Sequence, residues 1–510
     1  MSIRAAVTAT TLAVLACAVT APLARAEPGR PPGLGPDGTS TVHGDAWSSD
    51  TLPGTGPGPT PTVRGSLTGA TCSTVFVGSD GLPVALCTAY LGLTPPTPLA
   101  PTVMLLDPAT GAPVAQVQLA KGALLGGVYG YLDDRDRVVV ADGHGTLLAV
   151  AHERDAAGAW RMRVDVLSDL STVVPQGDSL TGLAPSFDGR VWFATSGGVV
   201  GTVRPGDDAS VRTLALPAGE RITNGLTVRD GGASVLTTRG LYELDQSADG
   251  TPVVRWSRDY AVGPARKPGL LAHGSGTTPT YFGDGAVAGS GGAGGLVAIT
   301  DDAPAPELVV LRRSDGGEVC RMPAFATTLD PGSAAPDGVV IEGPAATENS
   351  IVATGNALLL VNTYGYQYPP FAVDGPSAPE TASYTGGMTR VDVAADGSCR
   401  RTWTSTTRTA SLPKLTRDDG LVHALAYGPP LPAPESAAGV AESGWAQKLG
   451  PVAYTVTDAA TGREVARVPV GVAPVDEPME LTGTVVAGGE GAPGVMWQPT
   501  LTRMLRIGPA

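Results

Sequence analysis

Lysine and aromatic side chains are scarce in this chain of 510 residues. Four of its 34 basic residues are lysines, and aromatic residues make up 5% of the sequence. That aromatic fraction is too small for a stacking surface that reads sugars or bases along the whole molecule. The formal net charge is −14, which disfavours anionic partners such as nucleic acid or an acidic membrane surface.

The patterns of several common catalytic and membrane proteins are also missing. No HExxH zinc motif, GxSxG nucleophile elbow or CxxC pair occurs. The stretch GSGGAGG lacks the strand–helix context and the lysine of a phosphate loop. The sequence contains no run of about 18 uninterrupted apolar residues, which predicts no integral membrane segment. A convincing amphipathic helical pattern is absent too, which indicates an all-β chain.

One short phrase recurs along the sequence. An alternating apolar strand runs into an Asp- or Gly-centred turn, and a second alternating strand leads out. The clearest copies span residues 103–119 and 452–470, and looser copies begin at Leu241, Leu308 and Met388. Self-similarity at several tens of residues, with up to four short strands a copy, predicts a β-propeller. We place the repeat turns near Asp107, Arg154, Gly206, Asp245, Ser314, Ala394 and Ala459.

The last strand, at residues 500–508, lacks an outer partner in its own copy. Because a propeller closes by pairing its two chain ends in one blade, we predict that residues near Pro61–Ser66 supply that partner. Seven turns plus this split unit predict an eight-bladed β-propeller, and seven blades is the alternative. The predicted propeller domain covers 59–510 and follows a flexible, exposed arm over 27–58, in which only 43–50 looks ordered.

Residues 1–26 have the pattern of a secretory signal peptide. Arg4 gives the positive start, an apolar stretch follows, and Ala24-Arg25-Ala26 resembles a cleavage site. We therefore predict a secreted, extracellular protein, with lipidation at Cys17 as the alternative. Removing the segment takes away two arginines and no acid, which brings the charge from −14 to −16.

Four cysteines remain, an even number that favours disulfides in an exported protein. Cys72 and Cys87 bracket a predicted hairpin turn at 79–81. Cys320 and Cys399 occupy matching positions after the turns of two successive repeats. Of the three possible pairings we predict Cys72–Cys87 and Cys320–Cys399, and four buried thiols are the alternative.

The residues that open the innermost strands should point at the mouth of the central channel. We expect those strands at 222–226, 273–282, 346–353 and 412–416. Three long insertions, at 283–295, 362–387 and 427–445, are predicted to roof this mouth on blades five to seven. The candidate ligand-binding residues are Asn224, Thr277, Thr278, Asn349, Asn362 and Tyr364.

Three interpretations of these polar residues stay open. The first is a divalent-cation site, with Ca²⁺ as the candidate, because Glu348, Asn349, Asn224 and Asp301 offer hard oxygen ligands. The second is acid–base catalysis by Glu348 with Lys414 or His273 as its partner. The third is structural, since hydrogen-bonded polar side chains and water commonly fill narrow channels.

The Asp-x-x-Thr-Gly turns at Asp107–Gly111 and Asp458–Gly462 resemble those of the quinoprotein alcohol dehydrogenase-like propellers. That resemblance implies an eight-bladed fold and a quinone-dependent oxidoreductase as one alternative. The vicinal disulfide that this family places over its quinone has no counterpart, since no two cysteines are adjacent. The segments GSGTTPT, ATENS and NTYGY look more like a group of exported bacterial and fungal propeller proteins, which implies no particular activity.

Three classes of function follow from this fold: a channel enzyme, a binder of a small molecule or glycan, and a non-catalytic extracellular scaffold. A polar channel site favours a protein that acts on or binds a small molecule or glycan, and we expect it to be a monomer. An enzyme should concentrate perturbed carboxyl groups in the channel, and a scaffold should expose a large apolar patch.

Overall fold

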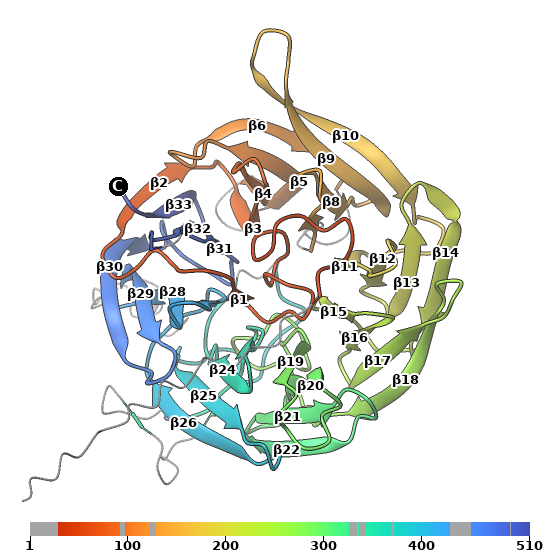
Figure 1. The fold of residues 1–510 in the computed structure, drawn as a ribbon, viewed down its shortest axis with the longest axis vertical. Helices are drawn as coiled ribbons and strands as arrows, with labels where there is room; N and C mark the ends of the chain where they lie inside the picture. Colours follow the sequence, from red (N-terminus) through yellow and green to blue (C-terminus); the bar gives the residue numbers. More distant parts are fainter. Residues whose placement is uncertain are drawn as a thin grey trace, which may run out of the picture.

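The protein forms a ring of eight β-sheets around a central axis (Figure 1). The computed structural model describes residues 29–91, 97–121, 129–325, 334–335, 343–368, 372–428, 450–489 and 491–510. Over these ranges the regular structure is β-strand, and no helix in them is long and apolar enough to cross a membrane. The eight-bladed propeller predicted from the repeats is therefore confirmed.

Seven blades consist of four consecutive antiparallel strands, ordered from the axis to the rim. Their strands are β3 (Thr71–Val77), β4 (Pro83–Leu91), β5 (Thr97–Leu106) and β6 (Pro113–Gln118) in blade 1; β7 (Tyr131–Leu132), β8 (Val138–Ala141), β9 (Thr146–Arg154) and β10 (Trp160–Asp169) in blade 2; β11 (Leu180–Pro185), β12 (Val191–Thr195), β13 (Val199–Arg204) and β14 (Asp207–Ala215) in blade 3; β15 (Leu226–Arg229), β16 (Gly232–Leu236), β17 (Gly240–Gln246) and β18 (Pro252–Asp259) in blade 4; β19 (Thr280–Asp284), β20 (Ala293–Thr300), β21 (Glu307–Arg312) and β22 (Glu318–Pro323) in blade 5; β23 (Val352–Thr354), β24 (Ala357–Val361), β25 (Met388–Val393) and β26 (Cys399–Ser405) in blade 6; and β27 (Lys414–Thr416), β28 (Leu421–Tyr427), β29 (Gly450–Asp458) and β30 (Glu464–Ala473) in blade 7.

Blade 8 is shared between the two ends of the chain. Its inner strands are β31 (Thr484–Val486), β32 (Val495–Pro499) and β33 (Arg503–Gly508), and its outer strand is β2 (Thr62–Leu67). β2 pairs antiparallel with β33 in a register that runs from Thr62 opposite Gly508 to Leu67 opposite Arg503. This pairing removes a free sheet edge and confirms the predicted closure by an N-terminal strand.

The seven predicted turns all connect the third strand of a blade to its outer strand. Local chemistry explains why they recur. Asp107 Oδ1 accepts hydrogen bonds from the main-chain N–H groups of Ala109 and Thr110, while Gly111 adopts a φ of +75°. An Asp carboxylate that binds the following main chain, with glycine in the left-handed region, is a stable tight turn.

Tryptophans on outer strands hold neighbouring blades together. Trp403 on β26 donates from Nε1 to the carbonyl of Ala459 at 3.0 Å, in the β29–β30 turn of the next blade. The indole lies against Gly462, where an added Cβ would come within 2.5 Å of the ring. Trp256 on β18 makes the same contact with Arg313 and Gly316 of blade 5. Each turn glycine therefore serves two needs, a left-handed φ and a close approach by the indole.

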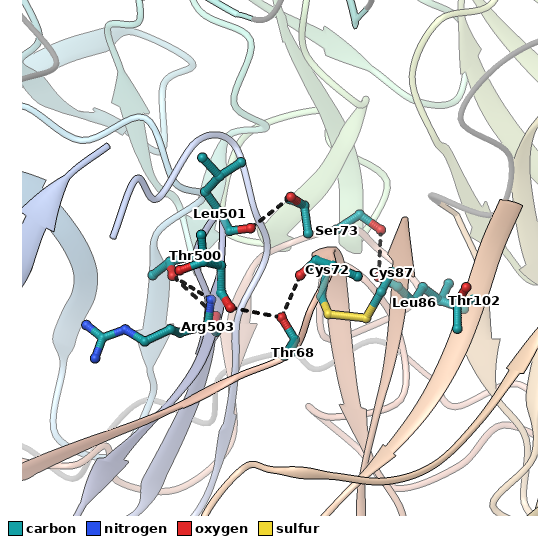
Figure 2. The surroundings of a disulfide bond; sticks show 12 residues. Thr68, Cys72, Ser73, Leu86, Cys87, Thr102, Thr500, Leu501 and Arg503 are labelled. Atoms are coloured by element: carbon teal, nitrogen blue, oxygen red, sulfur yellow. Dashed lines mark hydrogen bonds between the residues drawn. A yellow bond between two sulfur atoms is a disulfide. The ribbon is translucent and has the colours of Figure 1, made fainter. Parts of the chain in front are cut away.

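Both predicted disulfides are present. Cys72 and Cys87 lie opposite each other on β3 and β4, and Figure 2 shows their bridge close to residues Thr500–Arg503 of blade 8. Cys320 on β22 and Cys399 on β26 join the outer strands of blades 5 and 6. One bridge therefore lies beside the seam where the ring closes, and the other links two neighbouring blades.

The N-terminal segment, residues 29–56, differs from the predicted exposed arm. It runs inside the ring, where Figure 1 shows it in red-orange, and Leu34, Ser40, Asp50 and Leu52 are buried. We call this segment the plug. Its short strand β1 (Thr51–Leu52) pairs parallel with β27.

Main-chain carbonyls of the plug accept hydrogen bonds from the innermost strands of blades 1, 2, 4, 5, 6 and 7. Without the plug, these inner edges would present unpaired N–H groups in a narrow channel. The Pro- and Gly-rich composition, which predicts disorder, here allows the chain to follow the circle. The acceptor and donor pairs are Thr39 with Val77, Ser40 with Leu132, Ala46 with Val228, Trp47 with Tyr281, Ser49 with Ala353, and Asp50 with Leu415.

Candidate functional site

A cavity of about 340 Å³ lies on the propeller axis, at the end of the channel where the innermost strands begin. We call it the axial cavity. Every blade contributes to its wall through residues at or just before its innermost strand, and the wall mixes hydroxyl, amide and apolar side chains. One such residue from each blade, in chain order, is Ser73, Tyr129, Leu180, Asn224, Thr278, Ser350, Leu412 and Thr482.

The plug and one long insertion complete the cavity. Val42 and His43 of the plug line it, as do Tyr368 and Ala372–Asp374 of the β24–β25 connection. That connection belongs to the insertion at 362–387, which was predicted to roof the channel. It reaches this end because the second strand of a blade ends where the first begins.

The other two insertions differ from that prediction. Residues 283–295 connect β19 to β20, so they lie at the opposite end of the innermost strand, and Gly294 contacts the ring of Trp47 in the plug. Their position follows from the antiparallel order, since a loop after the first strand cannot reach the start of that strand. Most of the third insertion, residues 429–445, lies outside the described residues.

Three of the innermost strands begin later in the structure than the sequence predicted. The polar stretches 222–226, 273–282 and 346–353 are mostly the segments that lead into β15, β19 and β23. This shift turns predicted strand residues into cavity-lining loop residues. Two acids occupy such lead-in segments. Glu348 lies four residues before Val352 of β23, and Glu480 lies four residues before Thr484 of β31. The two carboxyl groups therefore occupy equivalent places in blades 6 and 8.

Glu348 is buried and lines the axial cavity. Its Oε2 accepts a hydrogen bond of 2.9 Å from the main-chain N–H of Leu271. Burial raises the pKa of the Glu348 carboxyl to about 8; the nearby Asp302 adds to this rise, while Arg266 and the Leu271 hydrogen bond oppose it. The side chain is therefore mostly protonated at neutral pH.

Glu480 lines the same cavity and was not among the predicted site residues. Its Oε2 accepts a hydrogen bond of 3.1 Å from the Tyr368 hydroxyl. Burial, together with the charge of Glu348, raises the pKa of Glu480 well above its ordinary value. The signal that could have found it is its place before the last innermost strand, which matches that of Glu348.

Lys414 is not the partner of Glu348, contrary to the acid–base prediction. Its Nζ lies 2.5 Å from Asp50 Oδ1 in the plug and donates to the carbonyl of Val42 at 2.7 Å. Asp50 Oδ2 lies 3.0 Å from Nδ1 of His43. Burial alone would raise the pKa of Asp50, but Lys414 and His43 hold it below its ordinary value.

His43 connects this ion cluster to the axial cavity. Its ring lines the cavity and is buried, and Nε2 has no hydrogen-bond partner among the described residues. His273, the histidine predicted as catalytic, is not among the cavity-lining residues. Its side chain is 42% exposed, and Nε2 lies 2.8 Å from the Gly263 carbonyl and 3.8 Å from Asp302.

Of the six predicted ligand-binding residues, the structure places Asn224 and Thr278 on the cavity wall. The other four hold loops together instead. Asn362 Oδ1 accepts from the main-chain N–H groups of Ala346 and Tyr364, and Tyr364 packs beside Leu270. Thr277 Oγ1 lies 2.9 Å from Ser275 Oγ, and Asn349 Nδ2 donates to the Ser411 carbonyl at 3.4 Å.

The predicted calcium ligands are not brought together. The Asp301 carboxylate accepts from the Glu307 main-chain N–H at 2.7 Å and lies 3.4 Å from Arg321, away from the axial cavity. Asn349 does not line the cavity either. Within the described ranges, no three His, Cys, Asp or Glu side chains cluster closely enough to hold a metal ion. The set Glu348, Asn349, Asn224 and Asp301 therefore does not form one cation site.

Comparison with known proteins identifies the fold. No protein-family model matches the sequence, and no curated protein matches it. Among solved structures, a europium-containing methanol dehydrogenase is 12% identical over 92% of this chain and 98% of its own, with a TM-score of 0.50. A quinohemoprotein alcohol dehydrogenase, ADHIIG from Pseudomonas putida HK5, is 9% identical over 92% of this chain and 80% of its own, with a TM-score of 0.53.

The chain therefore shares a β-propeller fold with these two dehydrogenases. At this identity the likeness concerns the fold alone. The residues present do not fit the quinone site that the sequence resemblance implied, since the four paired cysteines form two bridges between distant residues and none lines the axial cavity. We therefore derive no chemistry through a quinone.

Proposed function

We propose that this protein is an exported, monomeric propeller that binds a small organic molecule in the axial cavity. The volume of about 340 Å³ is within the range of ligand pockets, which combine apolar walls with a few placed polar groups. Export is supported by the N-terminal sequence pattern and by two disulfides, which persist in oxidising compartments.

The observation that carries this proposal is the pair of cavity-lining carboxyl groups. Glu348 and Glu480 form no ion pair within the described part of the chain, although burial raises the pKa of both. Buried acids in a purely structural role are normally paired, as Asp50 is here. Unpaired carboxyl groups with perturbed pKa values, gathered in one cavity, are typical of ligand and active sites.

A second candidate function is acid–base catalysis on the bound molecule. Glu348, whose pKa is raised to about 8, can donate a proton at neutral pH. The ring of His43 lines the same cavity. A proton-donating carboxyl group and an imidazole beside one cavity favour such chemistry.

The binding proposal can be tested with a variant that fills the cavity. Ala372 lines the axial cavity, whereas Ala156 lies exposed in the β9–β10 turn, so Ala372→Trp and Ala156→Trp form a matched pair. A panel of small amines, alcohols, sugars and carboxylic acids is screened by thermal unfolding. A ligand should raise the midpoint temperature of the natural chain and of Ala156→Trp, but not of Ala372→Trp. An equal shift in Ala372→Trp would place binding elsewhere and contradict the proposal.

A further inference from the structure

We propose that the ligand of the axial cavity is a small organic ammonium ion, held between the carboxyl groups of Glu348 and Glu480 and beside the rings of Tyr129 and Tyr368. This inference rests on the proposed binding function and adds the chemical class of the ligand. Four features of the cavity support it: the arrangement of the acids, the hydrogen-bonding character of the wall, its charge balance and its aromatic surface.

The two acids are equivalent by blade position, and the equivalent position in blade 5, next to blade 6, leaves room beside Glu348. In blade 5, the residue four positions before β19 is Gly276 rather than an acid. A Cβ there would lie 2.6 Å from Glu348 Oε2 and 2.5 Å from the Thr347 carbonyl. A larger side chain at this position would therefore displace the Glu348 carboxyl from its place in the cavity wall.

The hydrogen-bonding groups of the wall include the oxygen acceptors of both carboxyl groups. The ring of His43 lies beside them and is fixed by the contact of 3.0 Å between its Nδ1 and the Asp50 carboxylate. An ammonium group has only donors, which complements the acceptors of the two carboxyl groups.

The basic side chains around Glu348 already have other partners. Arg266 donates to the main-chain carbonyls of Leu270 and Gly375, so its N–H groups are committed although its charge still acts on Glu348. Asp302, which also acts on Glu348, lies 3.2 Å from Lys267. His273 lies 3.8 Å from the same Asp302 carboxylate.

At the cavity wall, Arg221 lies 2.5 Å from Asp374 and is neutralised by it. The titratable groups left facing the cavity are then the two acids, His43, and the hydroxyls of Tyr129 and Tyr368. Among the described residues that line the cavity, no basic side chain is therefore left unpaired for an anionic ligand. A cationic ligand would supply the missing charge and would also be attracted by the faces of the tyrosine rings.

Binding of a cation should release protons. Burial raises the pKa values of Glu348 and Glu480, so both are mainly protonated in the empty cavity at neutral pH. A bound cation favours the ionised forms and lowers these pKa values. Affinity should therefore rise with pH, by up to about tenfold per pH unit for each proton released, until about pH 8 for Glu348.

Three probes of matched shape test this inference: benzylamine, benzyltrimethylammonium and benzyl alcohol. Their binding to the full chain is measured by titration calorimetry from about pH 6 to about pH 8, in two buffers of different ionisation enthalpy that reveal proton release. We expect both cations to bind at least about tenfold more tightly than benzyl alcohol at about pH 7.5 and to release protons. In Glu480→Gln, which keeps an acceptor for Tyr368, cation affinity should fall about tenfold while benzyl alcohol binding stays within about twofold.

The outcomes separate this inference from the proposal on which it rests. If benzyl alcohol binds as tightly as the cations with no proton release, the cavity is a ligand site but the ammonium inference is wrong. Cation binding that persists unchanged in both Glu480→Gln and Ala372→Trp would show attachment outside the cavity and would also overturn the inference. If none of these probes binds and the broader panel shows no shift that Ala372→Trp abolishes, both proposals fail.

Discussion

The plug and the axial cavity lie on the same axis, yet Asp50 of the plug and the two acids of the cavity are held in opposite ways. In the plug, Asp50 is held by Lys414 at 2.5 Å and by His43 at 3.0 Å, and its pKa lies below the ordinary value. In the cavity, Glu348 and Glu480 lack ion-pair partners in the described structure, and their pKa values are raised. Burial favours the protonated form of all three acids, so the difference comes from the ion pair that Asp50 makes with Lys414 and that Glu348 and Glu480 do not make within the described structure.

This difference indicates that the ion cluster around Asp50 serves stability, whereas the cavity acids serve the proposed binding function. The ion cluster ties residue 50 to residue 414 and so locks the plug into the ring. The cavity acids cost stability when ionised, and such a cost is typical of sites that await a ligand. Each of the following predictions changes one side of this comparison.

The largest effect should come from removing the cation of the plug. Lys414→Met leaves the buried Asp50 carboxylate without its ion pair, which should lower the free energy of unfolding by about 3–5 kcal/mol. Because the pKa of Asp50 is lowered in the folded protein, its contribution is present above the ordinary Asp pKa and is lost as pH falls through the folded value. The deficit of Lys414→Met should therefore shrink below about pH 4.

Urea denaturation across this pH range measures the deficit. The double variant Asp50→Asn/Lys414→Met serves as the control, because it removes both charges and should recover part of the loss. A single variant as stable as the natural chain at neutral pH would mean that the ion cluster does not lock the plug.

A smaller effect of opposite pH dependence is expected at the cavity. The pKa of Glu348 is about 8 in the folded protein, above its ordinary value, so the folded state binds an extra proton and loses stability as pH rises toward 8. Glu348→Gln removes this titration and keeps an acceptor for the Leu271 N–H. The variant should gain about 2–3 kcal/mol over the natural chain between about pH 5 and about pH 8.

Denaturation curves of Glu348→Gln and the natural chain at both pH values give this difference directly. A constant difference across the range would show that Glu348 does not titrate as proposed. Opposite pH trends in the two variants, Lys414→Met and Glu348→Gln, would support the contrast between the plug and the axial cavity.

The parts of the fold that could be predicted from sequence are those with local causes. The turn at Asp107–Gly111 is set by an Asp carboxylate, its own following N–H groups and one left-handed glycine, so its recurrence marks each blade. The partner of the last strand could also be predicted, because an outer sheet edge without a neighbouring strand leaves main-chain groups unpaired. The two disulfides follow from matching positions in hairpin and repeat.

The site was less predictable because its contacts join distant residues. Lys414 and Asp50 are 364 positions apart, and a Pro- and Gly-rich segment carries no local sign that its carbonyls will meet the inner edges of the blades. Glu348 and Asn224 were predicted from their polar character before a strand. The same argument applied to the last blade would have found Glu480, since the spacing to the innermost strand is the same.

The smallest effect is expected at the histidine that sequence reasoning favoured. His273 lies outside the wall of the axial cavity, and its partly exposed ring makes one contact of hydrogen-bond length, to the Gly263 carbonyl. His273→Ala should therefore lower the free energy of unfolding by only about 0.5–1 kcal/mol. Its benzylamine affinity should stay within about twofold of the natural chain, whereas His43→Ala should weaken it at least about tenfold by removing a ring from the cavity wall. Calorimetry of the two variants under the same conditions measures both affinities. A larger loss of benzylamine affinity in His273→Ala than in His43→Ala would contradict the proposed site and place the ligand near Asp302 instead.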